Sequence, residues 1–242
     1  MKRDAIALAA FGVVALFVAN AMLSMDVNPG ISDFYNKYGH RIAPNMVTLI
    51  VFDFRGYDTL GECVILVTGV LAVSMLFGRG LLKGDVQEEP QYMPQSTLVL
   101  RLFTPLILSI TTALGVYVAL GGHITPGGGF QGGSIVAAGM LLALMVLGRK
   151  HLSLSEGTLV KMEAFGVFLY IFLGLAGLLF GGYFLYNTGA DFYGLVSPGI
   201  KGVFNYPDAV NAGILPYLNI AVLIKVSAGI STIALIFLGV KR

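Results

Sequence analysis

The 242-residue chain has few charged residues. Lysine and arginine number 15 and aspartate and glutamate number 13, which together make 12% of the sequence. Soluble domains carry about 25% charged residues, so this composition excludes a water-soluble globule. Hydrophobic residues make up 56% of the chain, which also excludes a disordered segment or a nucleic-acid-binding protein.

Cysteine and histidine are also scarce. The single Cys63 cannot form an internal disulfide, and its apolar surroundings indicate an inert packing residue. His40, His123 and His151 are far apart in the sequence, and no His-Glu-x-x-His motif is present. We therefore expect no metal centre, no cofactor and no catalytic chemistry of the chain's own, although it could be a subunit of an oxidoreductase complex.

Six apolar runs are long enough to cross a membrane as helices, which requires about 20 residues. Their continuous character distinguishes them from barrel strands, in which polar and apolar residues alternate. We therefore predict an all-α, polytopic membrane protein with about six transmembrane helices. The runs are Ala5–Leu23, Thr59–Phe77, Leu98–Leu120, Phe130–Leu147, Leu159–Phe180 and Ile214–Val240.

Basic residues between the runs predict the orientation. With the N-terminus inside, eight basic residues fall on the inner side and four on the outer side. The positive-inside rule then places both termini in the cytoplasm, and we expect a prokaryotic cell membrane. An alternative for the first run is a cleaved signal peptide, because Ala19-Asn20-Ala21 resembles a peptidase site.

The runs fall into two groups. Residues 1–77 hold two spans, residues 98–242 hold four, and 78–97, with Pro90 and Pro94, is predicted to be a cytoplasmic linker. Within the first group, the stretch 45–54 is apolar but too short to span. Val47, Ile50, Val51 and Phe54 recur in it at helical spacing, which predicts an interfacial helix.

Lys225 lies near the middle of the sixth run. It is roughly 16 Å or more from either end at 1.5 Å per residue, which is too deep for its ammonium to reach an interface. Ala221, Ala228, Gly229 and Thr232 lie on the same face and favour close packing in a bundle. Lys225 is therefore either part of an ion path or one half of a buried structural ion pair.

Glu62 lies about one turn inside the second run. Arg55, Asp58, Thr59 and Glu62 share one helical face if the helix begins early, which would make Glu62 a functional carboxylate. Alternatively, Thr59 and Glu62 form a capping box at the helix start. Both interpretations are open.

Two further ionisable residues lie near the predicted inner ends of spans. Glu163, in the fifth run, is either functional or an inexpensive interfacial carboxylate beside a snorkelling Lys161. Arg101, in the third run, is expected to snorkel to the inner surface.

A glycine-rich turn, residues 121–134, joins the third and fourth runs. Gly127, Gly129 and Gly132 match GxGxxG, but no strand precedes them, which excludes a dinucleotide site. Irregular backbone at membrane depth persists only where protein buries it or water reaches it. His123 could transfer protons there. Alternatively, the turn feeds a packing face from Gly129 to Gly133.

The turn also carries a family resemblance. Gly122-His123, the run Pro126–Phe130 and Gly132-Gly133 resemble the signature of the B subunit of Mrp-type multisubunit sodium/proton antiporters. The earlier motif Val51–Glu62 is similar to one in the C-terminal part of the antiporter A subunit. The same two pieces occur as separate small subunits in archaeal membrane-bound hydrogenases and related respiratory complexes, and this chain resembles a fusion of them.

The resemblance implies a four-helix B-like domain at 98–242, preceded by an A-like two-helix segment at 1–77. It also implies that Arg55, Glu62, Pro126 and Phe130 matter for cation transport. The expected function is a membrane subunit of a sodium/proton antiporter module in a larger antiporter or hydrogenase-like complex. Its partners would be other membrane subunits, hydrogenase-like peripheral subunits, Na⁺, H⁺ and the lipid bilayer.

The candidate residues form two groups. The ion path would comprise Glu62, Arg55, Asp58, Lys225, Glu163 and His123, and the outer turn would comprise Pro126, Phe130, Gly127, Gly128 and Gly129. Two alternatives are a purely structural subunit of such a complex and a stand-alone solute transporter. The second would be expected to show internal repeats, and no convincing repeat relates the two halves.

Overall fold

The computed structural model describes residues 2–24, 30–39, 42–78, 96–148, 152, 155–188, 190–192, 195–196 and 212–239. The chain forms two compact units, Met1–Tyr35 and Asn36–Arg242. The first unit contains the continuous 22-residue helix α1 (Lys2–Leu23) and the beginning of the short helix α2 (Ser32–Gly39).

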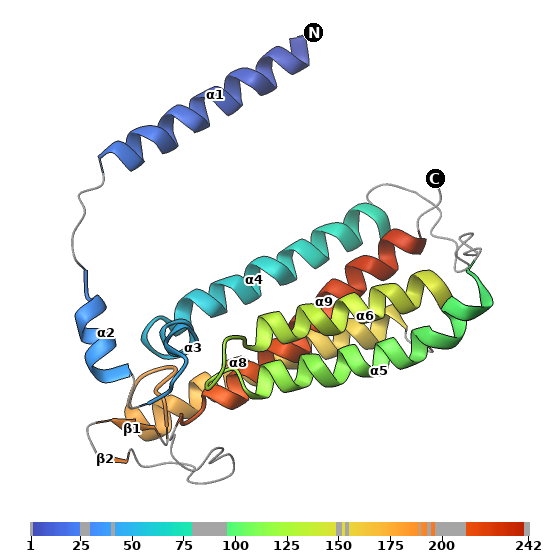
Figure 1. The fold of residues 1–242 in the computed structure, drawn as a ribbon. Coiled ribbons are helices and arrows are strands. Elements are labelled where there is room, and N and C mark those ends of the chain that lie inside the picture. Colours follow the sequence, from blue (N-terminus) through green and yellow to red (C-terminus); the bar gives the residue numbers. More distant parts are fainter. Residues whose placement is uncertain are drawn as a thin grey trace. The chain divides into compact units, whose positions relative to one another are not determined.

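The second unit is a helical bundle (Figure 1). A short α3 (Met46–Leu49) continues as the π-helix η1 (Ile50–Phe54), and α4 (Gly56–Val73) ends in the π-helix η2 (Ser74–Gly78). The longer helices are α5 (Leu98–Leu120), α6 (Gly129–Leu147), α8 (Glu156–Gly181) and α9 (Leu215–Gly239). Between α8 and α9, β1 (Asp191–Phe192) pairs antiparallel with β2 (Leu195–Val196).

The predicted all-α membrane architecture is confirmed. Five helices in the described part of the chain are long and apolar enough to cross a membrane, namely Gly56–Phe77, Leu98–Leu120, Gly129–Leu147, Glu156–Gly181 and Leu215–Leu238. The first predicted run contributes the shorter apolar stretch Phe11–Leu23 within α1. Most of the predicted linker (79–95) and the C-terminal residues 240–242 lie outside the described residues, and the cytoplasmic placement of the termini stays a prediction.

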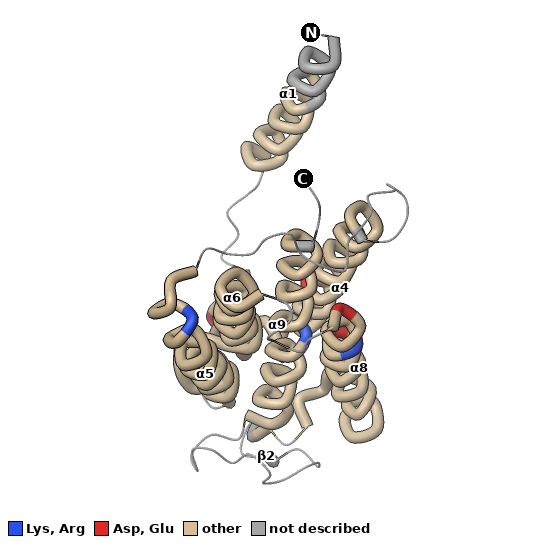
Figure 2. The backbone as a smooth tube through the Cα atoms, turned by 90° about the vertical axis from the view of Figure 1, so that its right-hand side faces the viewer, with Lys and Arg blue, Asp and Glu red and all other residues tan. Residues whose placement is uncertain are grey.

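Helix α9 is the centre of the bundle. It packs against α4, α5, α6 and α8, and Figure 2 shows it between the α5–α6 pair and the α4–α8 pair. Within its membrane-length window, 67% of the residues are buried inside the chain, against 11% for the α4 span. The predicted small-residue face explains this position, because Ala221 and Ala228 are buried and let neighbouring backbones approach.

Glycines of α6 also explain its tight packing against α5 and α9. A Cβ atom placed on Gly132 would overlap the carbonyl oxygen of Gly115, and one on Gly133 would lie 2.8 Å from Val226 Cβ on α9. Both sites therefore need a residue without a side chain, as the predicted packing face from Gly129 to Gly133 requires.

The stretch 45–54 is helical, as predicted, but its buried face is different. Thr48, Leu49 and Phe52 are buried, whereas Val47 is exposed. The reason is hydrogen bonding to a distant part of the chain: Asn45 and Thr48 bind the glycine-rich turn and so set which face of α3 points inward.

Candidate functional site

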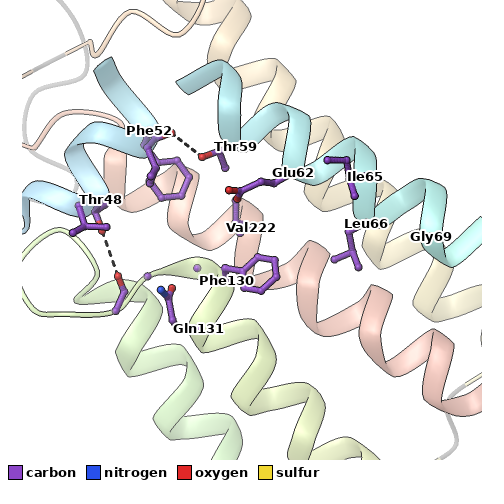
Figure 3. A pocket seen from close by; sticks show the side chains of 15 residues that line it. Thr48, Phe52, Thr59, Glu62, Ile65, Leu66, Gly69, Phe130, Gln131 and Val222 are labelled. Atoms are coloured by element: carbon purple, nitrogen blue, oxygen red, sulfur yellow. Dashed lines mark hydrogen bonds between the residues drawn. The ribbon is translucent and has the colours of Figure 1, made fainter. Parts of the chain in front are cut away.

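A pocket of about 640 Å³ lies between the beginning of α4, the glycine-rich turn and α9. Its polar lining residues are Thr48, Thr59, Glu62 and Gln131, and Phe52, Phe130 and Val222 are among its apolar ones. Figure 3 shows Glu62 reaching from α4 toward Val222 of α9, with the Phe130 ring of α6 nearby. The two sequence motifs, which are far apart in the chain, thus meet in one cavity.

The start of α4 frees Glu62 for this pocket. The helix begins at Gly56, directly after Arg55, whose N–H donates to the Ile50 carbonyl at 2.7 Å and ends η1. Thr59 is therefore inside the helix, and its Oγ1 donates to the Val51 carbonyl at 2.7 Å. The capping-box interpretation is wrong, because Thr59 is not the residue that precedes the helix. The early start that places Glu62 and Arg55 on one helical face is confirmed.

The glycine-rich turn presents backbone to the same pocket. Gly127 and Gly128 have φ angles of +148° and +155°, a backbone conformation that residues other than glycine rarely adopt. Gly127, Gly128 and Gly129 all line the cavity, as does Phe130. Pro126 is exposed and does not belong to the lining.

Two asparagines that sequence reasoning missed hold this turn. Asn219, fully buried on α9, accepts the N–H of Gly129 through Oδ1 at 2.7 Å and so caps the beginning of α6 from a different helix. Asn45 donates through Nδ2 to the carbonyls of Gly122 at 2.7 Å and Thr125 at 2.9 Å. The only sequence signal was a polar residue in or beside an apolar run.

Thr48 adds a further bond to the turn. Its Oγ1 donates to the Gly122 carbonyl at 2.7 Å, and the Asn45 N–H donates to the His123 carbonyl at 3.1 Å. The segment before α4 is therefore joined to the turn before α6 through the side chains of Asn45 and Thr48 and through the backbone N–H of Asn45. This junction fixes the glycine-rich turn against the segment that precedes α4.

The other predicted ion-path residues occupy different places. Arg55 and Asp58 form an exposed ion pair, with Nη2 and Oδ2 2.7 Å apart, so Arg55 is paired with Asp58 and not with Glu62. Exposed i,i+3 pairs contribute well under about 1 kcal/mol. His123 is buried in the turn and is not among the lining residues. Arg101 is exposed, and its Nε donates to Ser96 Oγ at 2.7 Å.

Lys225 and Glu163 lie outside the pocket lining but are both buried, with 1% and 5% of their surface exposed. They come from adjacent helices, α9 and α8. The structure thus brings these two predicted residues to one helix interface and leaves Glu62 as the charged residue of the pocket. Among the described residues, no group of three or more His, Cys, Asp and Glu side chains is placed to hold a metal ion.

A second carboxylate, Asp53, was not anticipated. It lies in η1, and its Oδ2 accepts from Asn187 Nδ2 at 2.8 Å, while Asn187 Oδ1 accepts from the Ile214 N–H at 2.9 Å. Burial raises the pKa of Asp53 to about 6, and the hydrogen bond from Asn187 partly opposes this rise. Asp53 and Asn187 together connect η1 with the beginning of α9.

Replacing Asp53 by asparagine is expected to stabilise the chain at neutral pH but not at pH 4. Because the folded-state pKa is raised from 3.8 to about 6, the folded chain binds protons more tightly. The free energy of unfolding therefore falls by at most about 3 kcal/mol as the pH rises from 3.8 to about 6. Above that pH it no longer changes on account of Asp53. The amide of the variant would be neutral throughout and could still accept from Asn187.

The measurement is the midpoint of thermal unfolding in detergent, compared for D53N and the parent chain from pH 4 to pH 7.5. Groups common to both proteins cancel in the difference between the two midpoints. That difference should be near zero at pH 4 and grow in favour of D53N up to about pH 6. A difference that does not change with pH would show that Asp53 titrates normally.

Comparison with known proteins places the chain in a family. A family model described as a domain related to the MnhB subunit of the Na⁺/H⁺ antiporter matches residues 99–232, and a model for the MbhE component of MBH matches residues 1–88. An uncharacterised protein of Methanocaldococcus jannaschii is 38% identical over 249 residues, covering 96% of this chain and 91% of the relative. The chain belongs to the family of domains related to the MnhB antiporter subunit.

Two solved structures have a similar fold. A chain of the membrane-bound sulfane sulfur reductase, an archaeal respiratory membrane complex, has a TM-score of 0.70 and 26% identity, with 98% of this chain and 99% of that chain covered. A chain of the Mrp complex from a Dietzia species has a TM-score of 0.68 and 21% identity, with 99% of this chain but 26% of that chain covered. Together the matches support a multi-pass membrane subunit of a cation antiporter-type complex.

Proposed function

We propose that the pocket handles the transported cation, with Glu62 as the carboxylate that binds Na⁺ or gives up its proton. The supporting observation is that Glu62 and the backbone of the glycine-rich turn line the same cavity. A hard cation requires several oxygen ligands. Glu62 supplies carboxylate oxygens, Thr48 and Thr59 supply hydroxyls, and the turn supplies carbonyls.

The electrostatics of the pocket favour this role. Glu62 is an acidic side chain in a cavity whose other lining residues are uncharged. The cation Arg55 is already neutralised by Asp58 at 2.7 Å, so it does not cancel the charge of Glu62. The carboxylate therefore has a cation or a proton as its natural partner.

The sodium and proton specificity and the host complex are also part of the proposal. The Na⁺/H⁺ antiporter in the family description suggests these two ions. The respiratory and Mrp complexes to which the similar structures belong suggest other membrane subunits as partners. Hydrogenase-like peripheral subunits and a prokaryotic cell membrane would fit the same assembly.

Exchange of Glu62 for glutamine tests the proposal in the whole complex, purified and reconstituted into vesicles. The loss of one interaction with a charged group, about 1.5–3 kcal/mol, should lower Na⁺ uptake driven by a pH gradient by about 10- to 150-fold. Glu62→Asp should retain part of the uptake, because it keeps the charge.

The matched control is Glu156→Gln, which removes a glutamate from the first turn of α8, outside the pocket lining. It should leave uptake unchanged. If the E62Q complex assembles and transports Na⁺ at the parent rate, the cation site is elsewhere. In that case the chain acts as a structural subunit.

A further inference from the structure

The buried Lys225 and Glu163 belong to one stretch of the α8–α9 interface. Gly166, one turn beyond Glu163 on α8, lies directly against Lys225, since a Cβ on Gly166 would be 2.7 Å from the Lys225 Cβ. Glu163 in turn faces Gly229, one turn beyond Lys225 on α9, with Oε1 2.8 Å from the position of a Gly229 Cβ. The two glycines make room for the two charged side chains.

Helix α4 closes the third side of this interior. Val70 Cγ2 lies 3.4 Å from the same Cβ position on Gly229. Cys63 and Glu62, also on α4, act electrostatically on Lys225, as does Glu163. The titratable groups that act on Lys225 are therefore Cys63 and Glu62 from α4, and Glu163 from α8. Tyr170 of α8 is coupled to Cys63 and Glu62.

These charges are not neutralised by direct contacts. Arg55–Asp58 is the ion pair found among the described residues, so Glu163 and Lys225 stand farther apart than a salt bridge. Glu163 Oε1 is buried and has no hydrogen-bond partner in the described part of the chain. A buried carboxylate oxygen without a partner costs about 1–3 kcal/mol or more, and water bridges such groups in polar interiors.

The three charged residues follow one another through the bundle. On α9, Val222 lines the pocket, and Lys225 and Gly229 lie about 4.5 Å and 10.5 Å further along at 1.5 Å per residue. Val70 of α4, which like Glu163 lies against Gly229, is about 12 Å along the helix from Glu62. The order from the pocket inward is therefore Glu62, then Lys225, then Glu163.

Glu163 is close to the opposite end of the bundle. It lies seven residues after Glu156, about 10 Å from the beginning of α8. The second half of α8 leads to the pocket side. Tyr170 Oη donates to the carbonyl of Gly56, the first residue of α4, at 2.9 Å, and Leu185, which follows α8, packs on the same glycine. A series of groups that begins at the pocket therefore ends near the far surface.

We propose that Lys225 and Glu163 form a proton relay that connects the pocket with the opposite end of the bundle, with water bridging the gaps. The proposal rests on the proposed function of Glu62. The carboxyl of Glu62 loses its proton to the neutral Lys225 amine, so an O–H bond breaks and an N–H bond forms. The ammonium then protonates the Glu163 carboxylate, and Oε1 releases the proton at the far side.

The relay gives a physical reason for exchange of the two ions. A cation that binds Glu62 displaces its proton, and Lys225 is a buried base within electrostatic reach of Glu62. After Glu163 has released the proton, Lys225 and Glu163 are back in their first states. Glu62 returns to its carboxyl form when a proton from the pocket side replaces the bound cation. No oxidant, reductant or further reactant takes part.

The test uses the reconstituted complex and two assays. One follows exchange of labelled Na⁺ for Na⁺ at equal pH on both sides, which needs no net proton movement. The other follows proton release into the vesicle lumen on addition of Na⁺. Lys225→Met and Glu163→Gln should leave the Na⁺-for-Na⁺ exchange unchanged. Each should lower the rate of proton release by about a hundredfold, which is the effect of a lost acid–base group. Lys161→Met, an exposed lysine on α8, is the matched control.

Each outcome has a separate meaning. Unchanged proton release in both variants, or equal loss of both assays in an assembled complex, overturns the relay. Loss of both assays in E62Q supports the pocket, and unchanged behaviour of E62Q overturns the pocket itself. If the single variants fail to assemble, the double variant K225M/E163Q removes both buried charges, which proteins tolerate better than one unpaired charge. The relay requires that it too exchange Na⁺ without moving protons.

Discussion

Replacing Gly132 by valine is expected to abolish assembly of the subunit. A Cβ at this position would overlap the Gly115 carbonyl and lie 3.0 Å from Ala119 Cβ and 3.2 Å from the Ala119 nitrogen. Two of these three atoms are backbone, so no flexible side chain can move aside. Overpacking alone costs about 1–3 kcal/mol, and here α5 and α6 must separate along their contact, against a total stability of only about 5–15 kcal/mol.

The measurement is the amount of subunit in the membrane and its migration with the complex on a native gel. Gly157→Val is the matched control, because a Cβ on Gly157 meets only Ser155 Oγ at 3.8 Å. We expect the control to assemble and G132V to be absent from the complex. Normal assembly of G132V would mean that α5 and α6 pack differently in the complex.

Replacing Asn219 by alanine should have the next largest effect. The change leaves the buried N–H of Gly129 without its acceptor, 2.7 Å away at present, and leaves the Leu215 carbonyl without the amide donor 3.1 Å away. A lost buried partner costs about 1–3 kcal/mol, which corresponds to about 2–4 °C in the unfolding midpoint for each kcal/mol in a chain of this size. Because Asn219 also holds the turn against α9, Na⁺ transport should fall as well.

Gln131→Ala provides the control for Asn219. Gln131 lines the same pocket but is exposed, so its removal should leave the unfolding midpoint of the detergent-solubilised complex within about 2 °C of the parent value. An unchanged midpoint in N219A would show that α6 does not depend on the cap from α9. Equal shifts in both variants would trace the effect to the pocket in general.

Several features of the site were predictable because they depend on local sequence. The continuous apolar runs predict the membrane helices, since no polar backbone can face lipid. Lys225 was predicted to be buried on a small-residue face because its depth exceeds the reach of its side chain, and the structure confirms this with 1% exposure. The glycine-rich turn was predicted to be an unusual backbone, and Gly127 and Gly128 have positive φ angles.

Other features depend on which elements meet. Whether Glu62 was a capping residue or a pocket carboxylate depended on where α4 begins, and that follows from the hydrogen bonds of Arg55 and Thr59 to η1. The roles of Asn45 and Asn219 could not be seen, because their partners lie 77 and 90 residues away in the chain. Likewise, the hydrogen bond between Asp53 and Asn187 joins residues 134 positions apart, and it forms only because the connection after α8 folds back onto η1.

The sequence alone determined the helical membrane class, the depth of Lys225 and the identity of the two motifs. The class and the depth follow from the cost of moving polar groups into an apolar layer, which each segment meets by itself. The motifs were identified by their resemblance to a family, which also depends on contiguous residues alone. Only the tertiary structure decided that Glu62 faces the glycine-rich turn and that Glu163 lies beside Lys225. Those pairings depend on which helices pack side by side, and small residues such as Gly132, Gly166 and Gly229 select them through close approach in three dimensions.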